Sequence, residues 1–184
     1  MKKTLKIILI VLVIIIAVPL ILAAFTKKDY AVEREIVIHK PKQEVFDFVK
    51  LLRNQDLYSK WAEMDPNQVN TYTGVDGTPG FISAWEGNRD VGKGEQEIIR
   101  VVEGERIDTE LRFIEPFKSQ SDAYLITESI GDHQTLVRWG FSGRMPWPMN
   151  LFLLIMDMDE SIGADYDYGL HKLKNILEAS AAVE

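Results

Sequence analysis

The stretch from Gly87 to Lys93 comes nearest to a motif with known chemistry, because its glycines and lysine follow the spacing of a phosphate-binding loop. In that motif a Ser or Thr follows the lysine and holds magnesium, and a helix begins at that point. Here Gly94 follows Lys93, and the next residues, Glu95 to Ile99, are typical of a strand. We therefore interpret the glycines as parts of a hairpin turn.

The densest group of oxygen-bearing side chains is formed by Asp157, Asp159 and Glu160. A calcium-binding loop would continue with a third ligand two residues after Asp159 and with glycine at its sixth position. Those two positions hold Ser161 and Ile162. Acidic residues near the start of a helix interact favourably with the helix dipole. We therefore predict a solvated helix start and no metal site.

Histidine, cysteine and serine give no support to a catalytic centre. His39, His133 and His171 are expected in a loop, a turn and a helix, without the spacing of metal ligands. The chain has no cysteine, which excludes disulfides, thiol catalysis and zinc–thiolate sites. It also has no Gly-x-Ser-x-Gly sequence for a serine nucleophile. We predict no catalytic residue, no metal and no cofactor.

Arg112 and Arg138 are each expected on a strand, with Asp108 and Glu110 on the same outward side. Pairs of opposite charge on neighbouring strands would stabilise a sheet modestly. A register shift of one residue would instead turn both arginines inward, where they could bind a carboxylate. The sequence leaves both arrangements open, and we expect the outward one.

Large apolar side chains are the best candidates for ligand binding. On strands such aromatics usually form plain core, and a binding role needs a cavity that they line without filling it. Gly163 and Gly169, inside a predicted long helix, each cost about 1 kcal/mol relative to Ala. Either close packing or space for a ligand would explain these glycines. The candidate ligand-binding residues are Trp85, Phe113, Tyr124, Trp139, Phe141, Ile162 and Tyr166.

The segment from Pro148 to Leu177 is the main element that would hold these candidates around one space. Its apolar residues recur every three or four positions, which predicts one long helix with an apolar stripe. Such a helix cannot bury its stripe alone, so we expect a sheet to wrap around it. The stripe consists of Leu151, Ile155, Met158, Ile162, Tyr166, Leu170, Leu173 and Leu177.

The residues before this helix predict a curved antiparallel sheet of about seven strands. Short alternating segments are separated by polar turns, and two short helices follow the first strand. The predicted strands are 30–38, 69–73, 81–86, 94–102, 106–115, 123–130 and 135–144, with short helices at about 41–49 and 52–61. Side chains expected to face inward include Ile107, Leu111, Phe113, Val137, Trp139 and Phe141. Side chains expected to face outward include Arg106, Asp108, Glu110, Arg112, Arg138 and Ser142.

Residues 7–25 form an uncharged run with lysines on both sides. As a helix this run is roughly 28 Å long, close to the thickness of a bilayer core. The alternative is a cleaved signal peptide, but its apolar region is normally shorter and ends at a small-x-small site, whereas Leu22 precedes Ala23 and Ala24. We predict a retained transmembrane anchor in residues 1–28 and one domain in residues 29–184. Three lysines before the run and two after it favour a cytoplasmic N-terminus and a domain on the outer side of the cell membrane.

Charge is unevenly distributed along the chain. Residues 1–28 have five lysines and no acidic residue, which leaves 16 basic and 28 acidic residues in 29–184. A domain with a net charge of −12 repels nucleic acid, so we exclude a nucleic-acid partner. Nothing in the sequence indicates an oligomeric state.

With this order of elements, residues 30–178 resemble the START-like, polyketide cyclase/dehydrase (SRPBCC) superfamily. The resemblance implies an α+β helix-grip fold, in which a curved antiparallel sheet wraps around a long C-terminal helix and a deep apolar cavity lies between them. Various members hold lipids, sterols, polyketides or hormones there, and no catalytic motif is shared. The matching stretches are Val45–Val49, Trp85–Asn88, Gly92–Glu95, Gly104–Ile107, Leu111–Pro116, Thr135–Trp139, Gly143–Met145 and Gly169–Lys174.

The resemblance and the aromatic faces together favour a membrane-anchored protein that binds a small apolar ligand. One alternative is an enzyme of the cyclase/dehydrase or hydrolase type, which needs a titratable group of shifted pKa inside the cavity. Tyr124 is the only clear candidate for such a group on the expected inward faces. The other alternative is a protein-interaction or folding-assistance module, with a filled core and an exposed apolar patch.

Overall fold

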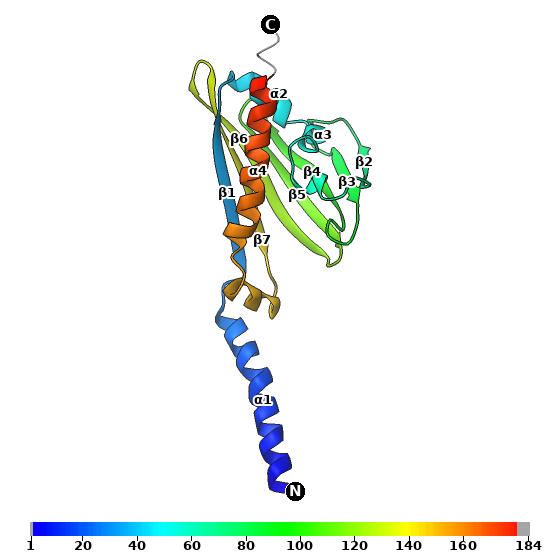
Figure 1. Cartoon of the computed structure of the whole chain (residues 1–184), viewed down its shortest axis with the longest axis vertical. Helices are drawn as coiled ribbons and strands as arrows, with labels where there is room; N and C mark the ends of the chain where they lie inside the picture. Colours follow the sequence, from blue (N-terminus) through cyan, green and yellow to red (C-terminus); the bar gives the residue numbers. More distant parts are fainter. Residues whose placement is uncertain (1, 180–184) are drawn as a thin grey trace.

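The computed structural model describes residues 2–179, in which a sheet and a long helix form one body and an isolated helix leads away from it (Figure 1). Residues 180–184, which the predicted domain includes, and residue 1 lie outside the described part. The helices are α1 (Lys2–Phe25), α2 (Lys42–Val49), α3 (Leu52–Gln55) and α4 (Met158–Ala179), with short 3-10 helices η1 (Trp61–Glu63) and η2 (Met149–Leu154). The strands are β1 (Asp29–Ile38), β2 (Val69–Thr73), β3 (Ile82–Glu86), β4 (Lys93–Val102), β5 (Arg106–Glu115), β6 (Ser119–Gly131) and β7 (Gln134–Arg144).

The seven strands form one antiparallel sheet in the order β1-β7-β6-β5-β4-β3-β2. Strands β2 to β7 follow one another as a meander, and β1 pairs with β7 along its whole length. The long helix α4 lies on the concave side of this sheet (Figure 1). It buries an apolar stripe that contains Tyr166, Leu170, Leu173 and Leu177. The predicted α+β helix-grip fold is therefore confirmed.

The alternation of buried and exposed residues along the strands follows the predicted faces. On β7, Val137, Trp139 and Phe141 are buried, and on β5 Ile107 is buried with Leu111 packed against the core. Burial of such side chains is the main favourable term in folding, at roughly 25 cal/mol per Å² of apolar surface. The period-2 pattern thus determines which face of each strand the helix covers.

The predicted helix over residues 148–177 is wrong in its first third. Residues 149–154 form η2, and α4 begins only at Met158. Asp157 caps α4, since its Oδ1 accepts a hydrogen bond from the backbone N–H of Glu160 at 3.0 Å. The residues before Asp157 turn away instead and pack against the end of α1.

Two further boundaries differ from the sequence prediction. The second short helix, predicted to reach Trp61, ends at Gln55 and is followed by turns and by η1. Strand β6 begins at Ser119, four residues before its predicted start, because Ser119 and Ser121 pair with Phe113 and Leu111 of β5. Both differences place polar residues next to the concave face of the sheet.

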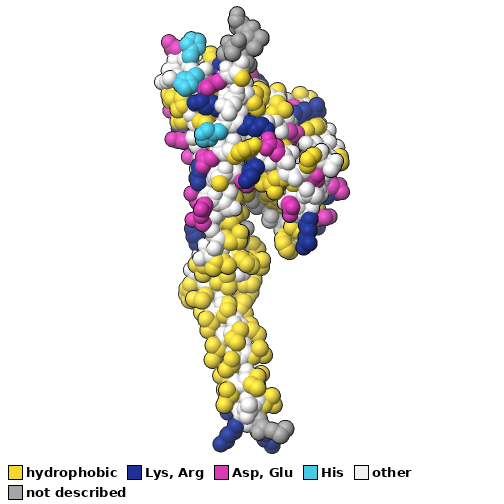
Figure 2. Space-filling model, viewed as in Figure 1, with side chains coloured by type: hydrophobic (Ala, Val, Ile, Leu, Met, Phe, Trp, Pro, Cys, Tyr) yellow, Lys and Arg dark blue, Asp and Glu magenta, His cyan; other side chains and the backbone are white. Residues whose placement is uncertain are grey.

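Helix α1 is 24 residues long and almost entirely exposed. Its length and composition suit a membrane span, and a signal sequence would have the same features. In the space-filling view its surface is apolar along its whole length, with lysines at the N-terminal end (Figure 2). The last turns of α1 contact η2 and the residues just before it.

Candidate functional site

A cavity of about 470 Å³ lies between the concave face of the sheet and the helices that cover it. Its volume falls within the ~300–1,000 Å³ that is usual for small-molecule pockets. Strands β1 to β7 supply one wall, with Tyr30 as the contribution of β1, and α4 and the segment from α3 to η1 supply the other.

Six of the seven predicted ligand-binding residues line this cavity. They come from β3, β5, β7 and α4, which are distant in sequence. Two of the aromatic pairs are in direct contact: Trp85 and Phe113 meet edge to face at 6.0 Å between ring centroids, and Trp139 stacks on Tyr166 at 4.2 Å. The six residues are Trp85, Phe113, Trp139, Phe141, Ile162 and Tyr166.

Tyr124, the seventh candidate, lies on the opposite, convex face of the sheet. Its neighbours on β6, Ala123 and Leu125, point inward and are buried, so Tyr124 points outward. Its hydroxyl donates a hydrogen bond to Glu33 Oε2, and the Arg106 guanidinium lies 4.4 Å from its ring centroid. The residue that was expected to supply a titratable group to the cavity therefore does not reach it.

The predicted arginines also lie on the convex face, so the outward arrangement holds and the register is not shifted. Arg112 forms ion pairs with Glu95, Glu97 and Glu110 at 2.6–2.7 Å. These three carboxylates raise the pKa of the Arg112 guanidinium further above its ordinary value. Arg138 pairs with Glu35 and Glu128.

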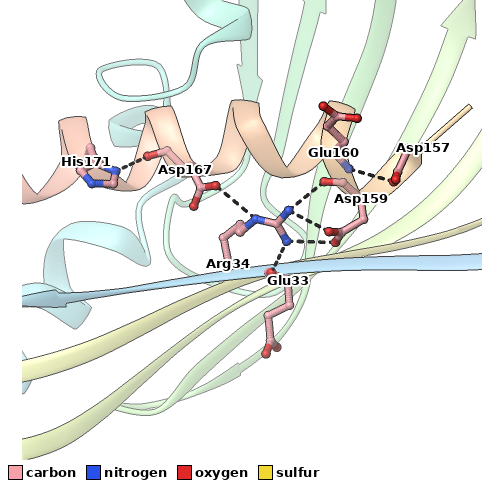
Figure 3. A network of polar contacts seen from close by, with 7 residues as sticks. All are labelled: Glu33, Arg34, Asp157, Asp159, Glu160, Asp167 and His171. Carbon is pink, nitrogen blue, oxygen red and sulfur yellow. Dashed lines mark hydrogen bonds and ion pairs between the residues drawn. The ribbon is translucent and has the colours of Figure 1, made fainter.

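The acidic group at the start of α4 holds the helix against the sheet. Arg34 projects from β1 toward α4, and its guanidinium binds both carboxylate oxygens and the carbonyl of Asp159 at 2.9 Å (Figure 3). Its Nε also donates to Asp167 Oδ2 at 3.2 Å. This clamp explains Gly163, where a Cβ atom would lie 2.0 Å from the Arg34 guanidinium.

Gly169 has a similar explanation in close packing. A Cβ atom there would lie 2.8 Å from the ring of Trp139 and 3.2 Å from the carbonyl oxygen of Tyr58. The glycine therefore lets α4 approach β7 closely at this point. Of the two explanations that the sequence left open for the helical glycines, close packing applies to both Gly163 and Gly169.

The part of the cavity wall that sequence analysis missed is polar. These side chains come from the segment between α3 and β2 and from β2, β3, β4 and β6, at positions where no large apolar residue marks the inward face. Alternation along β4 would have identified Gln96 as inward, but nothing in the sequence indicated that α3 ends before Asp56. The main members are Gln55, Asp56, Ser59, Gln68, Asn70, Ser83, Gln96 and Ser121.

Asp56 is the acidic group at the centre of this polar wall. Its Oδ2 accepts hydrogen bonds from the Tyr72 hydroxyl at 2.5 Å and from Asn70 Nδ2 at 3.1 Å. Among residues 2–179 its Oδ1 has no hydrogen-bond donor. Burial raises the pKa of the Asp56 carboxyl, and the hydrogen bonds from Tyr72 and Asn70 offset part of that rise.

Tyr166 contributes a second polar group to the cavity, on the side of α4. Its ring is buried against Trp139, and its hydroxyl has no hydrogen-bond partner among residues 2–179. Burial raises the pKa of this hydroxyl far above its ordinary value, so it stays protonated and can donate a hydrogen bond. The cavity therefore combines aromatic walls with a carboxyl on one side and a phenol on the other.

The cavity reaches the surface next to Phe117, which lines it and is 78% exposed. Phe117 and Pro116 lie in the β5–β6 turn, and Val91 lies in the β3–β4 turn. Because all strands are antiparallel, both turns lie at the end of the sheet where β1 begins. This is the end that carries α1 (Figure 1). We call Val91, Pro116 and Phe117 the cavity lip, and the acidic Asp90 and Glu115 line the cavity beside them.

Neither a family model nor a curated protein sequence matches the chain. Its fold does match solved structures. A protein from Nitrosospira multiformis aligns with 83% of this chain and 99% of its own, with a TM-score of 0.60 and 16% identity. Truncated norcoclaurine synthase from Thalictrum flavum aligns with 81% and 93%, at TM-score 0.59 and 8% identity. Ara h 8.0201 aligns with 82% and 99%, at TM-score 0.53 and 12% identity.

These similarities establish the helix-grip architecture of the described residues β1 to α4. At such low sequence identity they transfer no functional residue and no chemistry. The function of the cavity has to be argued from the side chains of this chain.

Proposed function

We propose that this protein binds a small, mainly apolar ligand in the cavity between sheet and α4, while α1 anchors it in a membrane. The observation that carries the proposal is a cavity of about 470 Å³ that is lined by aromatic side chains and that no part of the protein fills. A cavity of this size is costly to keep empty, because its lining forgoes both packing contacts and hydration. Its presence also argues against an interaction module with a filled core.

The lining further defines the chemistry of the ligand. Aromatic and aliphatic walls suit an apolar body of the lipid, sterol or polyketide type. Asp56 Oδ1 and the Tyr166 hydroxyl have no partners among residues 2–179, so each would gain a hydrogen bond from a polar group on the ligand. We therefore expect a ligand with a hydroxyl, amine or carbonyl group on an otherwise apolar skeleton.

The contacts of α1 support an anchor that is retained rather than cleaved. Ala23 is fully buried, and its carbonyl oxygen accepts a hydrogen bond from Asn150 Nδ2 at 2.7 Å. Asn150 is also fully buried, and cleavage of α1 would remove Ala23, its acceptor at the shortest distance, and leave only the carbonyls of Thr26 and Lys27. The lysine distribution supports an N-terminus in the cytoplasm and a domain on the outer side.

The proposal can be tested by native mass spectrometry of the full chain released from detergent, followed by extraction and identification of bound molecules. Ala123 and Asp122 are neighbours on β6 that face opposite sides, and only Ala123 lines the cavity. The Ala123→Phe variant should lose most of the bound apolar mass, whereas Asp122→Phe should keep it. Equal amounts in both variants and in the wild type would show that the molecules bind to α1 and not in the cavity.

An enzyme of the cyclase/dehydrase or hydrolase type is the second candidate, and Asp56 is the observation that favours it. A half-buried carboxyl of raised pKa beside a ligand cavity can act as a general acid or base. The same mass measurement separates the two functions. For a binding protein, the guest of Asp56→Asn has the same mass as the guest of the wild type. For an enzyme, the variant accumulates an unreacted guest of different mass.

A further inference from the structure

The segment between β7 and α4 has no charged residue from Met145 to Met156. Its apolar side chains are unusually exposed for a folded domain: Ile155 is 80% exposed and Leu154 is 61% exposed. Trp147, Met149 and Phe152 are exposed to nearly half. We call residues 147–156 the juxtamembrane segment. A contiguous exposed apolar surface of this kind marks a contact with a partner or a membrane.

Side-chain hydrogen bonds from Trp147 and Asn150 hold the juxtamembrane segment on the last turns of α1 and the residues that follow them. Asn150 Nδ2 donates to the carbonyl oxygens of Ala23 at 2.7 Å and Thr26 at 2.9 Å, and Trp147 Nε1 donates to the carbonyl oxygen of Leu20 at 3.2 Å. The last carbonyls of a helix have no hydrogen-bond donor within the helix, and the side-chain amide of Asn150 donates to one of them, that of Ala23. The segment is therefore fixed at the level where α1 ends.

We propose that the juxtamembrane segment lies in the membrane–water interface beside α1 and fixes how the sheet-and-helix body stands on the bilayer. This inference rests on the proposed membrane anchor. On the face shown in Figure 2, the apolar surface of α1 continues over the segment, and charged side chains appear above it. Lys27 and Lys28 follow α1 directly, as expected where a span leaves the hydrocarbon core.

The chemistry of the segment fits the interface better than a protein partner. Trp147 combines an apolar ring with a polar N–H, a combination enriched at the level of lipid headgroups. Arg144 and Asp157 carry charges at the two ends of the uncharged stretch. These charges favour water, so the stretch would stay in the interfacial layer of the bilayer. A membrane is also already present at this position once α1 spans it, and no other occupant is implied by the described residues.

One consequence concerns the cavity. With the segment in the interface, the end of the sheet where β1 begins faces the bilayer. The cavity lip, which contains the exposed Phe117, lies at this same end. The body would thus present the opening of its cavity toward the membrane, from which an apolar ligand could enter without crossing water.

Site-directed spin labelling of the full chain in phosphatidylcholine/phosphatidylglycerol vesicles tests the inference, because the chain has no native cysteine. Nitroxides attached to Ile155→Cys, Ile14→Cys and Val75→Cys report on the segment, on α1 and on an equally exposed loop at the far end of the sheet. We expect the ratio of collisions with oxygen to collisions with a nickel chelate to be several-fold higher at position 155 than at position 75. Position 14 should give the highest ratio.

Each other outcome has a definite meaning. A ratio at position 155 equal to that at position 75, with a high ratio at position 14, overturns the inference and leaves the anchor intact. Low ratios at both 155 and 14 show that α1 does not span the bilayer, and the inference falls with the anchor. Protection from both reagents at position 155, with spin–spin broadening that grows with protein density, shows that a second copy covers the segment, which also overturns the inference.

Discussion

The two faces of the sheet are built from the same strands, yet the concave face contains a cavity while the convex face has its charges closely paired. On the convex face Arg112 reaches three glutamates, and Arg106 covers the ring of Tyr124. Long charged side chains can find one another across strands at the surface, where water fills the remaining gaps. On the concave face, the space next to the strands is filled only where another element packs against them.

The position of α4 explains where that space remains. The helix is held close to β1 by the clamp between Arg34 and Asp159, and close to β7 by the contact of Gly169 with Trp139. Among the strands, its contacts are concentrated on β1. On the far side of the sheet α4 lies away from strands β2 to β5, and the cavity lies between these strands and the α3–η1 segment.

The largest effect is expected where α4 meets the sheet. Replacing Trp139 by Ala removes a ring that is 2% exposed and stacked on Tyr166, so it should lower the free energy of unfolding by about 3–5 kcal/mol. Trp85→Ala removes an equally large ring that borders the cavity, and it should cost less because fewer atoms surround the ring. Urea unfolding in detergent, followed by circular dichroism, measures both. Equal losses would mean that Trp85 is as tightly packed as Trp139 and that the proposed asymmetry is absent.

An intermediate effect is expected on the convex face. A Cβ atom at position 140 would lie 2.1 Å from Cζ of Tyr124, so Gly140→Ala must displace the ring from Glu33 and Arg106. We expect a loss of about 1–3 kcal/mol in the free energy of unfolding. In a Tyr124→Ala background the same substitution should be nearly neutral, which a double-mutant cycle would detect. The bound apolar mass should stay unchanged in both variants, and a loss of ligand would show that this face also serves the cavity.

The sequence predicted the sheet well because each strand carries its own signal. Alternation of apolar and polar residues, broken by Gly, Pro, Asn and Asp, located β1 to β7 with small shifts at their ends. The same local signal predicted the aromatic half of the cavity, because Trp85, Phe113 and Trp139 occupy inward positions of their strands. Local patterns were therefore enough to predict the position of a residue wherever that position depended only on its own strand and on the face of that strand.

The failures occurred where a tertiary contact overrides the local pattern. Leu151 and Ile155 continue the helical stripe, but Asn150 binds the end of α1 and Asp157 caps α4, so the helix begins later. Tyr124 is an aromatic residue on a strand, but its ring lies on the convex face. There it packs over Gly140 and is covered by Arg106. Asp56 lies within the helix predicted for residues 52–61, but α3 ends at Gln55, and Asp56 lines the cavity with its carboxylate bound by Tyr72 and Asn70.

The smallest effect concerns Asp56, and it links the polar wall of the cavity to pH. Burial raises the pKa of this carboxyl in the folded protein above its value in the unfolded chain. At a pH between these two pKa values the Asp56 carboxyl is protonated more often in the folded protein than in the unfolded chain. Its contribution to stability is therefore fully present below the unfolded-state pKa. It is lost as the pH rises through the folded pKa.

The free energy of unfolding of the wild type should therefore fall, relative to that of Asp56→Asn, as the pH rises from below the ordinary Asp range toward neutrality. The amide cannot ionise, and it keeps an oxygen acceptor for Tyr72 and Asn70, so the difference between the two proteins isolates the ionisation of Asp56. Urea unfolding at a series of pH values measures it. A difference that grows in favour of the wild type with rising pH would mean that the hydrogen bonds from Tyr72 and Asn70 outweigh burial. In that case the carboxylate would be the stabilised form, and the cavity would favour a ligand that donates hydrogen bonds or carries a positive charge.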